Sequence, residues 1–123
     1  DHAPHTADEK NSSMVKAPFG IVGMETAAAL TYTELVLGGY LTPMQMVEKM
    51  SYNPAQILHL KKGTLEEGRM ADVMLFDPEC TYAIDKNKFW SKAKNTPFHG
   101  RKVIGKVMMT ICDGKIVYDA AEE

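Results

Sequence analysis

The amino-acid sequence predicts an α+β fold, with helices first and a small sheet of about three or four strands after them. Three observations predict this class. Apolar residues recur at helical spacing within residues 24–60, short apolar runs typical of strands begin only after Gly68, and Asp113-Gly114 signals a hairpin near the end of the chain. Because the two kinds of element are segregated along the chain, we expect separate layers or parts of two domains.

The composition is that of a globular protein and excludes several functions. The 123 residues are 45% apolar and 24% charged, with a net charge of −2. Nothing resembles the basic surface of a nucleic-acid-binding protein, and no apolar run approaches the ~20 residues that span a bilayer. The two cysteines, Cys80 and Cys112, cannot form a disulfide framework, and we interpret them as buried thiols. We therefore expect a cytoplasmic protein that binds neither nucleic acid nor membranes.

The first half of the chain predicts a loop and three successive helices. Residues 1–18 show no periodicity and predict a loop. A helix is expected from Met24 to Leu37, ended by two glycines. Thr42 starts the next, with Pro at the first helical position and Gln45 completing a capping box. Asn53-Pro54 repeats this pattern, which predicts a third, short helix that ends before Gly63.

The second half predicts strands. Residues 71–76 are apolar and end at Asp77-Pro78, which predicts a strand followed by a turn. Residues 81–84 predict another short strand, and residues 95–100 a loop. Residues 106–112 and 115–118 flank Asp113-Gly114, the signature of a two-residue type I′ hairpin turn.

The densest group of reactive side chains is Asp1-His2-Ala3-Pro4-His5. A carboxylate and two imidazoles so close together can bind a metal, transfer a proton or hold an anion. The alternative from these residues alone is a solvated polar terminus. Because the chain starts inside this motif and without Met, we expect a cleavage product or a truncated piece of a longer enzyme.

A series of motifs resembles the type I dihydroorotases of the amidohydrolase superfamily. The matching residues are Asp1-His2-Ala3-Pro4-His5, Glu9-Lys10, 17–27, Leu41-Thr42, Met50-Ser51, 53–55, Gly63, Gly68, Ala71-Asp72, Ser91-Lys92, 95–98, Gly100 and 113–118. They span nearly the whole chain in the expected order. Related hydantoinases, dihydropyrimidinases and allantoinases usually lack a histidine at the fifth position of the first motif, so His5 favours dihydroorotase.

The resemblance implies a fold and a division of the chain. The family is a (β/α)8 barrel with a small β-sandwich, and catalytic residues lie at the C-terminal ends of the barrel strands. Residues 1–62 would be the end of the barrel: the end of strand 8, the active-site loop, helix 8 and the helices after it. Residues 63–123 would be the C-terminal portion of the sandwich.

The resemblance also implies site residues. Asp1 matches a catalytic aspartate that touches the metal, accepts a proton from the attacking hydroxide and passes it to the departing ring nitrogen. His5 matches a histidine that holds the substrate carboxylate, and Phe19-Gly20 a loop whose backbone borders the substrate ring. The cofactor implied is zinc, one or two ions per site, which makes hydroxide available at neutral pH. Proton transfer by a nearby carboxylate contributes ~10²–10⁴-fold to the rate.

The implied function is reversible hydrolysis of (S)-dihydroorotate to N-carbamoyl-L-aspartate in pyrimidine (UMP) biosynthesis. We expect a homo-oligomer, with aspartate transcarbamoylase as a candidate partner. Two alternatives stay open: another cyclic amidohydrolase of the hydantoinase or allantoinase type, and a non-catalytic dihydroorotase-like scaffold subunit. Because Asp1 is the one matched metal ligand and catalytic zinc needs three or four, we expect the 123-residue chain alone to be inactive.

Overall fold

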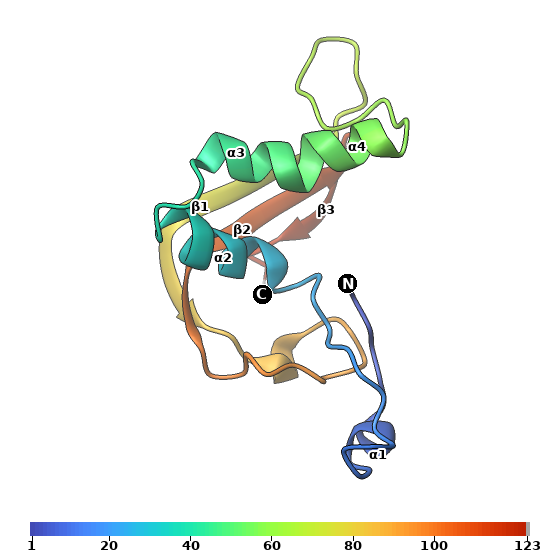
Figure 1. The fold of residues 1–123 in the computed structure, drawn as a ribbon. Helices are drawn as coiled ribbons and strands as arrows, with labels where there is room; N and C mark the ends of the chain where they lie inside the picture. The colour runs from blue at the N-terminus through green and yellow to red at the C-terminus, as the bar shows by residue number, and fades with distance from the viewer. Residues whose placement is uncertain (123) are drawn as a thin grey trace.

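The computed structural model describes residues 1–122 and confirms an α+β fold with helices before strands. Three antiparallel strands form one sheet in the order β1 (Val73–Ala83), β2 (Lys102–Cys112) and β3 (Lys115–Asp119). The helices of residues 27–57 pack together beside this sheet, while the opening residues extend away from it (Figure 1). Within the described residues, no helix has the length and apolar character needed to cross a membrane.

The helix predicted from Met24 to Leu37 is present but begins later. It consists of α2 (Ala27–Thr31) and the π-helical turn η1 (Tyr32–Val36), both of which contact β2. The side-chain oxygen of Thr33 donates to Ile104 O at 3.0 Å and accepts from Ile104 N at 2.9 Å. The helix is therefore joined to the central strand by a pair of hydrogen bonds as well as by packing.

A second helical rod follows, and the prediction of its start is confirmed. The side chain of Thr42 accepts from Gln45 N at 3.2 Å, and Gln45 Oε1 accepts from Thr42 N at 2.8 Å. The rod contains α3 (Pro43–Val47), the π turn η2 (Glu48–Tyr52) and α4 (Asn53–Ile57). The short helix predicted from Asn53 is present as α4 and ends before Gly63, but it continues directly from η2 without a side-chain cap, so the predicted cap at Asn53 is wrong. Pro54 gives no N–H to the helical ladder, and the π turn just before it changes the ladder's spacing.

The two strands predicted on either side of Asp77-Pro78 are one strand, β1. Asp77 Oδ1 accepts from Glu79 N at 2.8 Å and Cys80 N at 3.2 Å, which makes the expected local turn. The register with β2 shifts between Asp77 and Thr81, after which pairing resumes through Ala83. Pairing with the long strand β2 thus continues β1 through a local turn at which the sequence alone predicted the strand to end.

The predicted hairpin is confirmed. Asp113 and Gly114 have φ of 50° and 73°, the positive values that a type I′ turn needs at both central positions. The strand before the turn, β2, starts at Lys102 and is longer than predicted. Both cysteines are free thiols, but Cys112 is exposed beside this turn and Cys80 is half-buried, so the expectation of buried thiols is wrong.

The core lies where α2 meets the sheet. Ala29 of α2, Ile84 after β1 and Val103 of β2 are buried together, with Leu30, Tyr82, Phe89 and Phe98 packed around them. Large apolar side chains on the helices stay exposed, among them Leu37, Met44 and Ile57. The core takes residues from both sides of the predicted domain boundary after residue 62, and that boundary stays a prediction.

Candidate functional site

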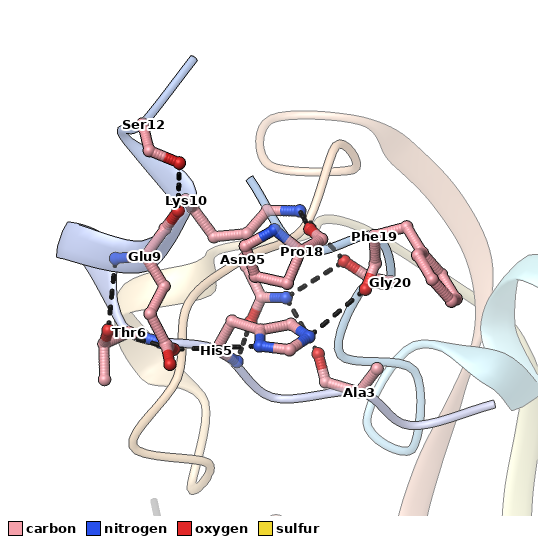
Figure 2. Close-up of polar contacts among 10 residues, drawn as sticks. All are labelled: Ala3, His5, Thr6, Glu9, Lys10, Ser12, Pro18, Phe19, Gly20 and Asn95. Carbon is pink, nitrogen blue, oxygen red and sulfur yellow. Dashed lines mark hydrogen bonds and ion pairs between the residues drawn. The ribbon is translucent and has the colours of Figure 1, made fainter. Parts of the chain in front are cut away.

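The site motif lies in two chain segments that run side by side. We call residues 1–5 the opening segment and residues 18–23 the glycine loop. Ala3 N donates to Ile21 O at 2.8 Å, and His5 Nε2 lies 3.2 Å from Phe19 O (Figure 2). Two of the predicted substrate-binding positions, His5 and Phe19, are therefore brought into direct contact. The contact uses the backbone carbonyl of Phe19, whose side chain is almost fully exposed.

A short helix that the sequence analysis missed holds the other side of His5. This helix, α1 (Ala7–Lys10), lies in the stretch predicted to be a loop. Thr6 and Glu9 form its capping box, and this pattern in the sequence is the signal that would have found it. The hydrogen bond from the Thr6 backbone is the main cause that lowers the pKa of the Glu9 carboxyl. Glu9 Oε2 lies 3.7 Å from His5 Nδ1, so both ring nitrogens of His5 face oxygen atoms.

The last residue of α1 shapes the glycine loop. Lys10 Nζ donates to Pro18 O at 2.9 Å and to Gly20 O at 3.2 Å. Gly20 has φ of +110°, and a Cβ added to it would lie 2.5 Å from the Cβ of Ala3. Gly20 is therefore required both by its backbone conformation and by the close approach of the opening segment. Gly20 thus lies beside His5, and its substrate-binding role stays a prediction.

An asparagine from a distant loop also lies between the two segments. The side chain of Asn95 contacts Ala3, His5 and Gly20, as Figure 2 shows. The sequence analysis placed Asn95 in a motif but gave it no role. Its contacts join residues 75–92 positions apart, so no local sequence signal indicated this role.

Asp1 lies at the far end of the opening segment and its side chain is exposed. Its neighbour His2 turns toward the glycine loop, where His2 Nδ1 accepts from Gly23 N at 3.1 Å and Met24 N at 3.4 Å. Gly23 has no room for a side chain, because a Cβ there would lie 2.9 Å from Asp1 O. His2 is therefore a structural residue that fixes the backbone beside Asp1, and its Nδ1 is occupied.

These residues do not make a complete metal site. No group of three His, Cys, Asp or Glu side chains comes together among residues 1–122. Asp1 can offer one carboxylate oxygen, while His2 and His5 use ring nitrogens in contacts within the chain. Catalytic zinc needs three protein ligands and an open position, so the described residues fit one ligand position of such a centre.

A broad, open cleft borders His5. Its volume is about 530 Å³, and its lining includes four lysines, Lys10, Lys86, Lys92 and Lys94, and no acidic residue. Two of these lysines also hold backbone carbonyls: Lys10 as described, and Lys94 through Phe89 O at 2.6 Å and Ser91 O at 2.8 Å. A cleft with these charges favours an anionic ligand over a cationic one.

Comparison with known proteins gives one family. Residues 1–117 match the model described as the Amidohydrolase family. Curated dihydroorotases are similar along almost the whole chain: that of Clostridioides difficile (strain 630) is 49% identical over 120 residues, and that of Acetivibrio thermocellus is 51% identical over 117 residues. These alignments cover 98% and 95% of this chain. The chain spans about 28% of the length of each relative.

Solved structures of cyclic amidohydrolases are similar in fold. A dihydropyrimidinase from Brevibacillus agri gives a TM-score of 0.90 at 27% identity, covering 97% of this chain and 27% of that one. The L-hydantoinase of Arthrobacter aurescens gives 0.81 at 32% identity, covering 87% and 24%. In both proteins the likeness extends across helices and sheet alike.

Proposed function

Because the chain belongs to the amidohydrolase family, we propose that the protein carrying it is a dihydroorotase. This enzyme would reversibly hydrolyse the cyclic amide of (S)-dihydroorotate to N-carbamoyl-L-aspartate, a step of pyrimidine biosynthesis. The observation that carries the proposal is the identity of about half of all aligned residues to curated dihydroorotases along nearly the entire chain. The basic cleft beside His5 supports an anionic substrate of this kind.

In this proposal Asp1 is the proton carrier. Water attacks the ring carbonyl carbon, Asp1 accepts a proton from it, and the carbon–nitrogen bond breaks as Asp1 delivers that proton to the departing nitrogen. The exposed carboxylate of Asp1 is free to face a substrate from the end of the opening segment. An amide nitrogen is a poor leaving group until it is protonated, so this transfer is where a carboxylate contributes most, about 10²–10⁴-fold.

Zinc, one or two ions per site, is part of the proposal for the whole protein. When bound, zinc lowers the pKa of water to about 7 and so makes hydroxide available at neutral pH. Asp1 would give one oxygen ligand, and the other ligands would come from outside the described residues. We propose accordingly that the 123 residues alone bind zinc weakly and do not turn over dihydroorotate.

His5, Phe19 and Gly20 form the substrate side of the proposed site. The imidazole of His5 lies between the Phe19 carbonyl, 3.2 Å from Nε2, and the Glu9 carboxylate, 3.7 Å from Nδ1. A substrate carboxylate would replace one of these oxygens. The carbonyl of Phe19 and the carbonyl of Gly20, which accepts from Lys10 Nζ, would border the substrate ring.

Placement in the whole enzyme follows from the same proposal. Residues 1–62 would complete the (β/α)8 barrel with the end of strand 8 and helix 8, and residues 63–123 would belong to the small β-sandwich. Exposed apolar side chains on the helical rods, such as Leu37 and Met44, support burial against further protein, as in a homo-oligomer. A cytoplasmic location and association with aspartate transcarbamoylase complete the proposal.

The test uses the natural protein that contains these residues. We expect zinc-dependent hydrolysis of dihydroorotate, a loss of about 10²–10⁴-fold in kcat for Asp1→Asn, and a higher KM for His5→Ala. His99→Ala is the matched control, because His99 contacts Asp85 and the backbone of Lys86 but does not itself line the cleft. Faster hydrolysis of hydantoin or dihydrouracil would favour the second candidate, a hydantoinase-type enzyme, which the structural neighbours support. A folded protein without metal or turnover would favour a scaffold.

A further inference from the structure

We propose that Asn95 is a positioning residue of this site, whose amide sets the spacing between the opening segment and the glycine loop. This inference rests on the proposed function for its effect on substrate. Its geometric part rests on contacts that do not depend on the reaction.

The contacts of Asn95 join the two segments at several points. Asn95 Oδ1 accepts from His5 N at 3.2 Å, while Nδ2 donates to Ala3 O at 2.9 Å and Gly20 O at 3.2 Å. The backbone carbonyl of Asn95 accepts from Val22 N at 3.1 Å. One residue thus holds backbone groups on both sides of the contact between His5 and Phe19 (Figure 2).

The chemistry of these contacts requires a short primary amide. The partners of Nδ2 are carbonyl oxygens, which only accept, and the partner of Oδ1 is an N–H, which only donates. Aspartate would keep the acceptor and lose both donors. Alanine would lose all three bonds and leave part-buried backbone groups of Ala3, His5 and Gly20 without these partners, which is unfavourable.

The loop that presents Asn95 is braced independently of its amide. Glu25 accepts from Trp90 N at 2.8 Å and Ser91 N at 3.0 Å. Lys94 ties the same turn together through Phe89 O and Ser91 O. Because this bracing is untouched when the Asn95 side chain is shortened, we expect the loop and the fold to persist in the variants while the site segments shift.

The expected consequence is a change in His5. The opening segment carries His5 and the glycine loop carries its partner, the Phe19 carbonyl, so loosening the amide alters the hydrogen bond at His5 Nε2. Residues that orient a functional side chain in this way are typically worth 10–100-fold in affinity or activity. Because His5 is proposed to hold the substrate carboxylate, the loss falls mainly on KM.

The experiment compares Asn95→Ala, Asn95→Asp and the control Asn87→Ala in the natural protein. Asn87 is exposed and lies in η3 (Lys86–Lys88), next to the cleft residue Lys86, but does not itself line the cleft. Three quantities are measured: the ¹⁵N chemical shift of His5 Nε2, identified by its absence in His5→Ala; KM and kcat for dihydroorotate; and the midpoint of denaturant unfolding. We expect both Asn95 variants to move the His5 signal and to raise KM about 10–100-fold with a smaller change in kcat. The control should match the unmodified protein.

The inference is overturned if both Asn95 variants leave the His5 signal unchanged, even if they lower the unfolding midpoint, because Asn95 would then act on stability alone. It is also overturned if the control reproduces their effects. If Asn95→Ala does not fold, Asn95→Asp decides. If the unmodified protein does not hydrolyse dihydroorotate, the proposed function fails, and the His5 signal still decides whether Asn95 positions the site.

Discussion

Replacing Gly20 with alanine tests the close approach of the two site segments. Gly20 has φ of +110°, and an alanine Cβ there would lie 2.5 Å from the Cβ of Ala3. The substitution therefore carries two separate costs. One is the left-handed backbone, and the other is the collision with Ala3. Gly68→Ala measures the backbone cost alone, because Gly68 has φ of +80° and no atom lies within 4 Å of its added Cβ.

The two costs have different expected sizes. A left-handed alanine costs about 1–2 kcal/mol, which is the whole effect expected for Gly68→Ala. Forcing an extra methyl group into a packed contact adds about 1–3 kcal/mol, so Gly20→Ala should cost about 2–5 kcal/mol in the free energy of unfolding. Because the colliding atom is the Cβ of Ala3, the double variant Ala3→Gly with Gly20→Ala should regain the stability that Gly20→Ala loses through the collision.

The assay is denaturant unfolding of five proteins: Gly68→Ala and the four members of a double-mutant cycle, which are the unmodified protein, Ala3→Gly, Gly20→Ala and the double variant. We expect a coupling of about 1–3 kcal/mol between positions 3 and 20. Equal losses for Gly20→Ala and Gly68→Ala, with no coupling to Ala3→Gly, would refute the argument. The opening segment would then not press against the glycine loop in solution.

Three further predictions concern the sheet and its supports. Gly105→Ala should cost about 2–5 kcal/mol in denaturant unfolding, because Gly105 has φ of +98° and its added Cβ would collide with the ring of Phe76. A loss below about 1 kcal/mol would contradict this packing. A hydrogen bond from Lys62 lowers the pKa of the Asp72 carboxyl below its usual 3.8, so this pair should stabilise the fold above that pH and stop doing so as the pH falls below it. The stability difference between the unmodified protein and Asp72→Asn should therefore be constant near neutral pH and shrink in acid; a pH-independent difference would count against the pair. Thr42→Ala should cost about 1 kcal/mol through loss of its cap, as measured by thermal or denaturant unfolding, and no loss would mean that the capping box is unformed in solution.

Signals that act over a few residues predicted the fold well. The capping box at Thr42 and the turn at Asp113-Gly114 depend on contacts within four positions, and both are present as expected. The helix α1 carries the same kind of signal at Thr6 and Glu9, but a four-residue helix shows no apolar period to accompany it. Residues that locally favour the end of a helix or strand were less informative. Pro54 and Asp77 predicted ends to elements that continue, because a π turn and the pairing with β2 outweigh the local preference.

The site was predictable only in part. His5, Phe19 and Gly20 were selected from one motif and its neighbour, and the structure brings them together. The role of Asp1 stays a prediction, because the other groups that its exposed carboxylate would need for that role are not among the described residues. Asn95 could not be given a role from sequence, since nothing local indicates that its amide meets residues about 90 positions earlier.

The long separation between Asn95 and Ala3, 92 positions, also orders events during protein synthesis. The opening segment leaves the ribosome long before the residue that joins it to the glycine loop has been added. At about 5–20 residues per second, the time between the synthesis of Ala3 and the synthesis of Asn95 is roughly 5 to 20 s. Throughout that time the opening segment lacks its hydrogen bonds to Asn95, so these contacts can form only after most of these 123 residues have been translated.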